Sequence, residues 1–279
     1  MTELPFNIAK AITRYEKIEY EGLVLWPVLV KEYDEFLISR PALEVLHQSL
    51  PVAMMRIPLL SALYRIDYEA SQSGKPLTGL FSRALLGLAL SLRLGEGLDT
   101  EKRVRMFQIA VDRNDRAMLV GLRYTDNDGK ECEIKPPSYR MLRMIIAAQN
   151  GVRMESEKAN PAIVEAKKKM SSGGVALNAS ADALISAVAA LSQTDEDEIY
   201  NWPILKLEKR SQTFMRVLQY VVNGIGEMSG ATWKGGNPTP HPFFERADNG
   251  GGLFSPVSEG EGKSAPEAAK KIAQLTKNL

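Results

Sequence analysis

The most apolar stretch of the chain, residues 77–94, limits the folds that are open to it. Its large side chains recur at helical spacing: Leu77, Phe81, Leu85, Leu88 and Leu92. A helix that is apolar on nearly every side needs neighbours all around it, which places it in the middle of a bundle. Its uncharged centre, residues 84–92, is too short to span a bilayer, so the stretch predicts a buried helix.

Further helices are predicted around this one. Pro41, Pro58 and Pro76 each fall where the first turn of a helix accepts proline. A short helix over residues 31–39 is expected to end before Pro41. Later helices are expected over three ranges: residues 139–149, 161–170 and 179–191. Ser138 is expected to cap the first of these and Gly151 to end it. Thr194 followed by Asp197 resembles a capping box for one more helix.

Two β elements are predicted from alternating apolar residues and turn signals. Residues 12–20 and 23–30 form an N-terminal hairpin around the turn Glu21-Gly22, with Pro27 favouring an edge strand or bulge. The second element is a three-stranded antiparallel meander. Its predicted strands are residues 104–111, 117–124 and 130–135.

The clearest amphipathic pattern lies near residue 220. Its apolar members follow the spacing i, i+3, i+4, i+7, i+8, i+11: Phe214, Val217, Leu218, Val221, Val222 and Ile225. Mostly polar residues separate them, so we expect a helix whose apolar face packs on another surface.

These patterns together predict a mainly α fold with a small antiparallel β component (α+β). It is a helical bundle with an N-terminal hairpin and a central three-stranded meander. We divide it into four regions: residues 1–100 hold the hairpin and a helical region, 101–135 the meander, 136–230 a helical region that packs on the first, and 231–279 a loop and mobile C-terminal tail.

Composition and cysteine usage point to a soluble intracellular protein. Lys and Arg number 35 against 34 Asp and Glu, so no net field favours nucleic acid or an anionic membrane. Cys132 is the only cysteine, which excludes an intramolecular disulfide and fits a reducing compartment. The N-terminus lacks the charged-then-apolar pattern of a signal peptide.

No catalytic residue, cofactor site or metal ligand is predicted. His47, His241 and Cys132 cannot supply any of the common zinc sites of four Cys, two Cys with two His, or three His. The glycines of residues 224–230 superficially resemble a dinucleotide loop, but they end a helix and do not follow a strand. Residues 126–129, Asp-Asn-Asp-Gly, are typical of a β-turn more than of a calcium loop.

Two functional alternatives stay open at this level. Acid/base carboxylates distant in sequence allow a carboxylate-dependent hydrolase or transferase. A nucleic-acid-associated factor requires a basic face. Such a face would form if Arg103 and Arg105 clustered with the three lysines of residues 167–169.

A loop region after residue 230 holds several large aromatic side chains. Aromatics in such a region either dock on the chain's own fold, which is the commoner outcome, or contact a partner. The candidate partner-binding residues are Trp233, His241, Phe243 and Phe244.

Several segments resemble structural-cluster proteins of tailed bacteriophages and prophages. Residues 20–28, YEGLVLWPV, with residues 33–37, YDEFL, resemble the opening of those proteins, followed by a "Ser-Leu-Pro" element at residues 49–51. Residues 143–151, RMIIAAQNG, are similar to their "Arg-x-Ile-Ile-x-x-Gln-Asn" helix end. Residues 235–244, GGNPTPHPFF, are similar to their closing "Gly-Asn-Pro" loop.

The resemblance implies a tail or baseplate component, or a tail-assembly chaperone, and brings no catalytic residues with it. Its partners would be other tail or baseplate proteins, the tape-measure protein among them, with no membrane and no nucleic acid expected. The implied location is the bacterial host cytoplasm during assembly, or the virion tail. A mobile C-terminus favours assembly or adaptor duty over a rigid tube or sheath.

Overall fold

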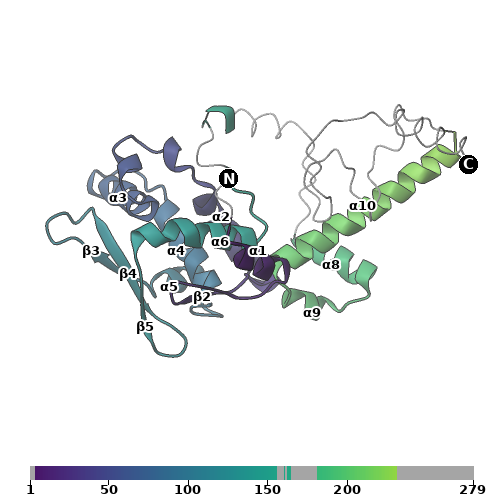
Figure 1. Ribbon diagram of the computed structural model, residues 1–279, viewed down its shortest axis with the longest axis horizontal. Helices are drawn as coiled ribbons and strands as arrows, with labels where there is room; N and C mark the ends of the chain where they lie inside the picture. The colour runs from purple at the N-terminus through teal and green to yellow at the C-terminus, as the bar shows by residue number, and fades with distance from the viewer. Residues whose placement is uncertain (1–3, 156–159, 161, 165–180, 231–279) are drawn as a thin grey trace, which may run out of the picture. The chain divides into compact units, whose positions relative to one another are not determined.

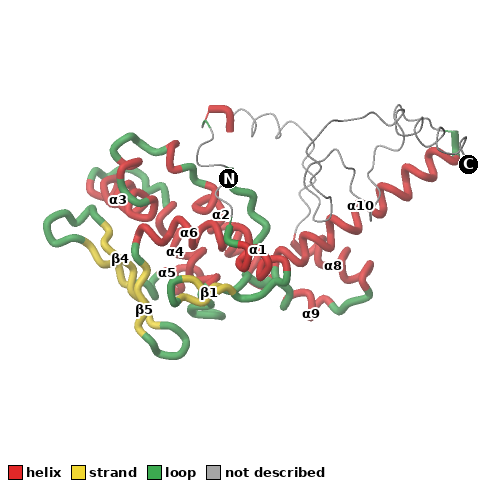
Figure 2. Tube along the Cα trace, viewed as in Figure 1, coloured by secondary structure: helices red, strands yellow, loops and turns green. Residues whose placement is uncertain are grey.

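The computed structural model describes residues 4–155, 160, 162–164 and 181–230. The chain divides into two compact units, Met1–Phe214 and Met215–Leu279, and each is described by itself. The described part is mainly α with two small antiparallel sheets, as predicted (Figure 2).

The helices labelled in Figure 1 are α1 (Phe6–Thr13), α2 (Tyr33–Glu44), α3 (Leu59–Gln72), α4 (Leu80–Ser91), α5 (Thr100–Val104), α6 (Tyr139–Gln149), α8 (Ala181–Ser192), α9 (Glu196–Tyr200) and α10 (Ile204–Met228). Short 3₁₀ turns are η1 (Val30–Glu32), η2 (His47–Ser49), η3 (Met54–Arg56) and η4 (Pro136–Ser138). The strands are β1 (Ile18–Tyr20), β2 (Leu23–Leu25), β3 (Gln108–Val111), β4 (Leu119–Thr125) and β5 (Glu131–Ile134).

Helix α4 occupies the centre of the first unit, which confirms the prediction from its apolar sequence. Every residue from Ala84 to Ser91 is buried, and α4 contacts α2, α3, α5 and α6. Helix α2 packs on α4 at Gly87, where a Cβ would make ordinary contact with Ser39 Cβ at 3.5 Å. We call the packed helices α2 to α6 the helical body.

The N-terminal hairpin is present but shorter than predicted. β1 and β2 are antiparallel, and Glu21 and Gly22 between them have φ of 50° and 77°, the left-handed values of a two-residue hairpin turn. Residues 12 and 13 belong to α1 instead of a strand, and β2 ends at Leu25, before Pro27. The chain after β2 continues without a strand and makes single hydrogen bonds with other parts of the fold. In one of them Trp26 N donates to Ser91 O at 2.7 Å.

The three-stranded meander is confirmed with the order β3-β4-β5, both pairs antiparallel. Its middle strand contacts α3, where the Ser61 hydroxyl donates to the Leu119 carbonyl at 3.0 Å. The first strand begins at Gln108 and not at residue 104, because α5 takes up residues 100–104. The Asp99 side chain caps that helix by accepting from Lys102 N at 2.8 Å.

Of the three prolines, only Pro58 starts a helix as predicted, at the N-cap of α3. Pro41 lies inside α2, and the prediction that the helix ends before it is wrong. Ala42 and Leu43, just beyond this proline, are fully buried, and their packing outweighs the hydrogen bond that proline cannot donate. Pro76 lies in the loop ahead of α4 and not in its first turn, so that prediction is wrong too.

The caps of α4, α6 and α9 depend on side chains that the sequence did not predict, or are absent. The start of α4 is capped from α3, because the Asp67 carboxylate accepts from the backbone N of Thr78, Gly79 and Phe81 at 2.8–3.2 Å. Ser138 precedes α6 but makes no side-chain cap. Asp195, and not Thr194, caps α9 by accepting from Asp197 N at 3.1 Å.

The remaining predicted elements divide between the described and undescribed parts of the chain. Helix α6 has the predicted bounds, and Gly151 follows it with φ of 74°. Helix α8 matches the prediction for residues 179–191 to within two residues. The predicted helix over residues 161–170, apart from residues 162–164, and the predicted tail after residue 230 lie outside the described residues.

Candidate functional site

The 25-residue helix α10 is anchored at its start by the first unit. Ile204 N donates to Val28 O at 3.0 Å, and Val30 N donates to Trp202 O at 2.8 Å. Leu207 is buried in a small apolar cluster with α8 and α9. The first turns of α10 are therefore fixed by backbone hydrogen bonds as well as by apolar packing.

Farther along, α10 exposes a stripe of apolar side chains that we call the apolar face of α10. Its members, with their exposed fractions, are Leu218 (46%), Val221 (49%), Val222 (65%), Ile225 (58%) and Met228 (90%). The sequence pattern predicted this helix, and the structure confirms the helix while leaving the stripe open. Exposed apolar residues that are scattered singly are ordinary, whereas these five recur at helical spacing along one helix.

Most of this part of α10 carries no charged residue. Residues 217–226, Val-Leu-Gln-Tyr-Val-Val-Asn-Gly-Ile-Gly, contain no Asp, Glu, Lys or Arg. Helices that face water normally carry charged residues on the solvated side. Nothing ionic therefore helps to hydrate this length of helix.

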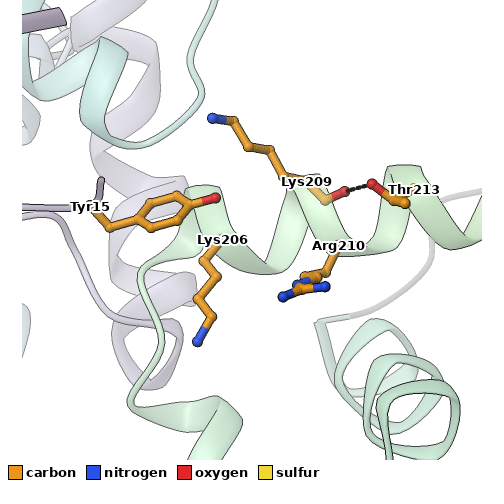
Figure 3. Close-up of a pocket in the computed structure, with 5 residues that line it drawn as sticks. All are labelled: Tyr15, Lys206, Lys209, Arg210 and Thr213. Carbon is orange, nitrogen blue, oxygen red and sulfur yellow. Dashed lines mark hydrogen bonds between the residues drawn. The ribbon is translucent and has the colours of Figure 1, made fainter. Parts of the chain in front are cut away.

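A second feature lies at the start of α10 and was missed from the sequence. Tyr15, Lys206, Lys209, Arg210 and Thr213 line a pocket of about 260 Å³ (Figure 3). Tyr15 comes from the residue pair after α1, far from α10 in sequence, so no local motif joins the two. The only signal was the spacing i, i+3, i+4 of the three cations, which puts them on neighbouring positions of a helix surface.

Carboxylates do not gather in the described part of the chain. No three His, Cys, Asp or Glu side chains among the described residues come together as a metal site requires. Burial raises the pKa of Glu208, and the charge of Arg40 partly offsets that rise. The Glu208 carboxylate faces Gly151, where a Cβ would overlap it.

The histidine and cysteine singled out from the sequence occupy structural positions. His47 lies half-buried in η2, a 3₁₀ turn, with Nε2 3.1 Å from Met54 O. Cys132 lies in β5, as predicted, with Sγ 3.8 Å from Asp126 Oδ2. The four candidate partner-binding residues, Trp233, His241, Phe243 and Phe244, lie outside the described residues.

The basic face proposed for a nucleic-acid factor is not formed by Arg103. Its side chain is 3% exposed and pairs with Glu32 at 2.7 Å, while Nε donates to Leu98 O at 3.2 Å. A guanidinium buried in this way joins α5 to η1 and cannot reach a phosphate. Arg105 pairs with Glu101, and residues 167–169 lie outside the described part.

Within the described residues, no helix combines the length and apolar character that crossing a bilayer demands. Comparison of the chain with models of protein families, with curated proteins and with solved structures finds no match in any of the three.

Proposed function

We propose that this chain is a non-enzymatic assembly protein of a tailed bacteriophage, a tail or baseplate component or a tail-assembly chaperone. The observation that carries the proposal is the apolar face of α10, exposed on a helix whose first turns are fixed. The resemblance of residues 20–28 and 143–151 to phage structural-cluster proteins supplies the setting. Such a protein works in the host cytoplasm during assembly or in the virion tail.

The partner that fits this face is an apolar, uncharged helix of another tail protein, such as the tape-measure protein. Side chains at the spacing of Leu218, Val221, Val222 and Ile225 insert between the side chains of a facing helix. Residues 217–226 carry no charge, so no ion pair can form along this length of the helix. A charged partner surface would lose its hydration there without gaining a counter-charge.

Separate co-expression with tape-measure, tube and baseplate proteins tests the proposal. The variant Val221→Lys puts a charge in the middle of the apolar face, whereas Gln219→Lys puts the same charge on an exposed position of the same helix outside it. We expect the unmodified chain and Gln219→Lys to co-purify with one of these proteins. Val221→Lys should lose at least about 90% of that complex, because burying a lone ammonium costs more than a contact of this size supplies.

Three results would overturn the proposal. The first is that the unmodified chain co-purifies with none of the tail proteins. The second is that Val221→Lys co-purifies with a tail protein as well as Gln219→Lys does. The third is a stable homodimer in light scattering that Val221→Lys alone dissociates, which would assign the face to a second copy of the chain. Circular dichroism of each variant confirms that α10 remains helical.

A further inference from the structure

Strand β3 is one edge of the meander, and within the described residues no strand lies on its outer side (Figure 1). In an antiparallel pair, the backbone N–H and C=O groups of every second residue point away from the partner strand. In the part of the chain that the structure describes, no residue of β3 makes a backbone hydrogen bond outside the sheet. Its outward groups are therefore available to pair with another extended chain.

The sequence of β3, Gln-Ile-Ala-Val, carries no charge and leaves apolar side chains exposed. Ile109 is 44% exposed and Val111 is 36% exposed. Ile109 is paired with the buried Leu122, and Val111 is paired with the buried Leu119. Residues that are directly opposite each other share a face of the sheet, so both exposed side chains belong to the core face. A further strand beside β3 would cover them.

The opposite edge of the same sheet is protected by charge. Charged side chains lie within β5 and directly beside it, at Lys130, Glu131, Glu133 and Lys135. Ile134 on the core face of β5 is only 1% exposed, although it is paired with Leu122 as Ile109 is. Charged side chains, lysine above all, keep an edge strand from pairing with other chains. The β3 edge lacks this protection.

Charged residues also limit the length of the apolar edge. Before β3 stands Arg105, which pairs with Glu101, and after it comes the turn of residues 112–116, Asp-Arg-Asn-Asp-Arg. The strand itself has 4 residues, which span about 13 Å. A stable dimer of whole chains buries about 800 Å² on each partner, from about 20–30 residues. An edge of this size fits a single short strand and not a second copy of the chain.

We propose that the outer edge of β3 binds a short extended segment of another protein, which adds a fourth strand to the meander. Backbone hydrogen bonds to β3 hold the segment in place. Its apolar side chains, at alternate positions, cover Ile109 and Val111, and β-branched residues suit these positions best. The residues between them face water and are polar. This site does not depend on the apolar face of α10 or on the partner proposed for it.

Fluorescence anisotropy of the full chain with a fluorescein-labelled peptide, Lys-Thr-Val-Thr-Val-Thr-Glu, tests the site. We expect one peptide to bind per chain. Ile109→Lys should weaken the peptide about tenfold or more, because the added strand would bury the new ammonium on the core face. Gln108→Lys puts the same charge on the exposed face of the same strand, opposite Arg123, and should leave the affinity unchanged.

Methylation of backbone nitrogens in the peptide tests the hydrogen bonds without altering the protein. One peptide carries N-methyl groups on its two valines, and a second carries them on two of its threonines. Alternate residues of a strand direct their N–H groups to opposite edges, so only one of these peptides loses its donors to β3. That peptide should bind about tenfold or more weakly, and the other should bind as the unmodified peptide does.

Any of three results contradicts the proposal: no binding at millimolar peptide, equal weakening by Ile109→Lys and Gln108→Lys, or equal affinity of the two methylated peptides. A dimer in light scattering that Ile109→Lys alone dissociates would instead assign the edge to a second copy of the chain. Circular dichroism and urea unfolding show whether Ile109→Lys keeps its fold. If it does not, the methylated peptides decide on the unmodified chain.

Discussion

Helix α4 carries a long apolar run and helix α10 carries an apolar stripe, and the two differ in burial. Residues 84–91 of α4 are all buried by neighbouring helices, whereas the apolar face of α10 is exposed. α4 has its partners within the same chain and contributes to stability. The apolar face of α10 is not buried by the described residues.

Charged residues of the helical body and of α10 differ in the same way as their apolar residues. In the helical body the deeply buried Arg103 has a carboxylate at 2.7 Å, while Arg210 on α10 has none within the described residues. Leu88 and Arg103 of the body are buried, whereas Leu218 and Arg210 of α10 are exposed. Matched substitutions in the two places therefore separate folding from binding.

The largest difference is expected between Arg103→Ala and Arg210→Ala. Removing Arg103 leaves the mostly buried Glu32 carboxylate unpaired, and the free energy of unfolding should fall by about 3–5 kcal/mol. Arg210→Ala removes an exposed side chain and should change stability by less than about 0.5 kcal/mol. Urea unfolding followed by circular dichroism measures both, and comparable losses would show that α10 belongs to the folded core.

Leucine substitutions extend the comparison to packing. Leu88→Ala opens a cavity inside the body and should cost about 3 kcal/mol, because Leu88 is fully buried. Leu218→Ala removes a side chain that is 46% exposed and should cost less than about 1 kcal/mol. Urea unfolding measures the stability of both variants. If Leu218→Ala lowers the free energy of unfolding as much as Leu88→Ala does, the apolar face is covered within the chain.

Local patterns in the sequence predicted the elements whose causes are local. The meander follows from turn residues between alternating strands, α6 from the stop at Gly151, and α4 from its apolar run. Short α5 was missed because a single side chain, Asp99, caps it, and a five-residue helix has too few residues to show a period. The prediction that a helix ends before Pro41 was wrong because the residues after Pro41 are buried, and helix propensity does not measure burial. Their packing keeps α2 helical through Pro41.

The candidate sites divide in the same way. The apolar face of α10 was visible as a stripe at helical spacing, since its members share one helix. The pocket was not, because Tyr15 reaches the cations of α10 only through the fold. The Asp67 cap on α4 was hidden for the same reason, as donors and acceptor lie on different helices.

Glycine substitutions give a smaller effect of the opposite sign. A Cβ at Gly87 meets Ser39 and Leu43 only at 3.5–3.9 Å, which is ordinary contact, and a Cβ at Gly224 meets nothing within 4 Å. Gly87→Ala and Gly224→Ala should each raise helix propensity, by about 0.5–1 kcal/mol. Thermal unfolding checks both. A loss for Gly87→Ala alone would show that α2 and α4 are packed too closely for a methyl group.

The smallest effect concerns Glu208, in the part of α10 that belongs to the first unit. Burial raises its pKa in the folded chain above the ordinary 4.5, so the folded state holds the proton more firmly than the unfolded state does. The contribution of Glu208 to the free energy of unfolding therefore falls as pH rises from about 4.5 to the raised pKa of the folded chain. Above that pKa the full loss of stability is present. Glu208→Gln cannot ionise, so it should be more stable than the unmodified chain at neutral pH. That advantage should vanish at acidic pH.

Unfolding of Glu208→Gln by urea across this pH range measures the effect. The exposed Glu131 of β5 offers a control, because Glu131→Gln removes a carboxylate that water already solvates. An advantage of Glu208→Gln that is equal at acidic and neutral pH would come from packing and not from ionisation. A loss at neutral pH would mean that the charge of Arg40 outweighs burial, and that the first turns of α10 are held by that attraction as well as by apolar contacts.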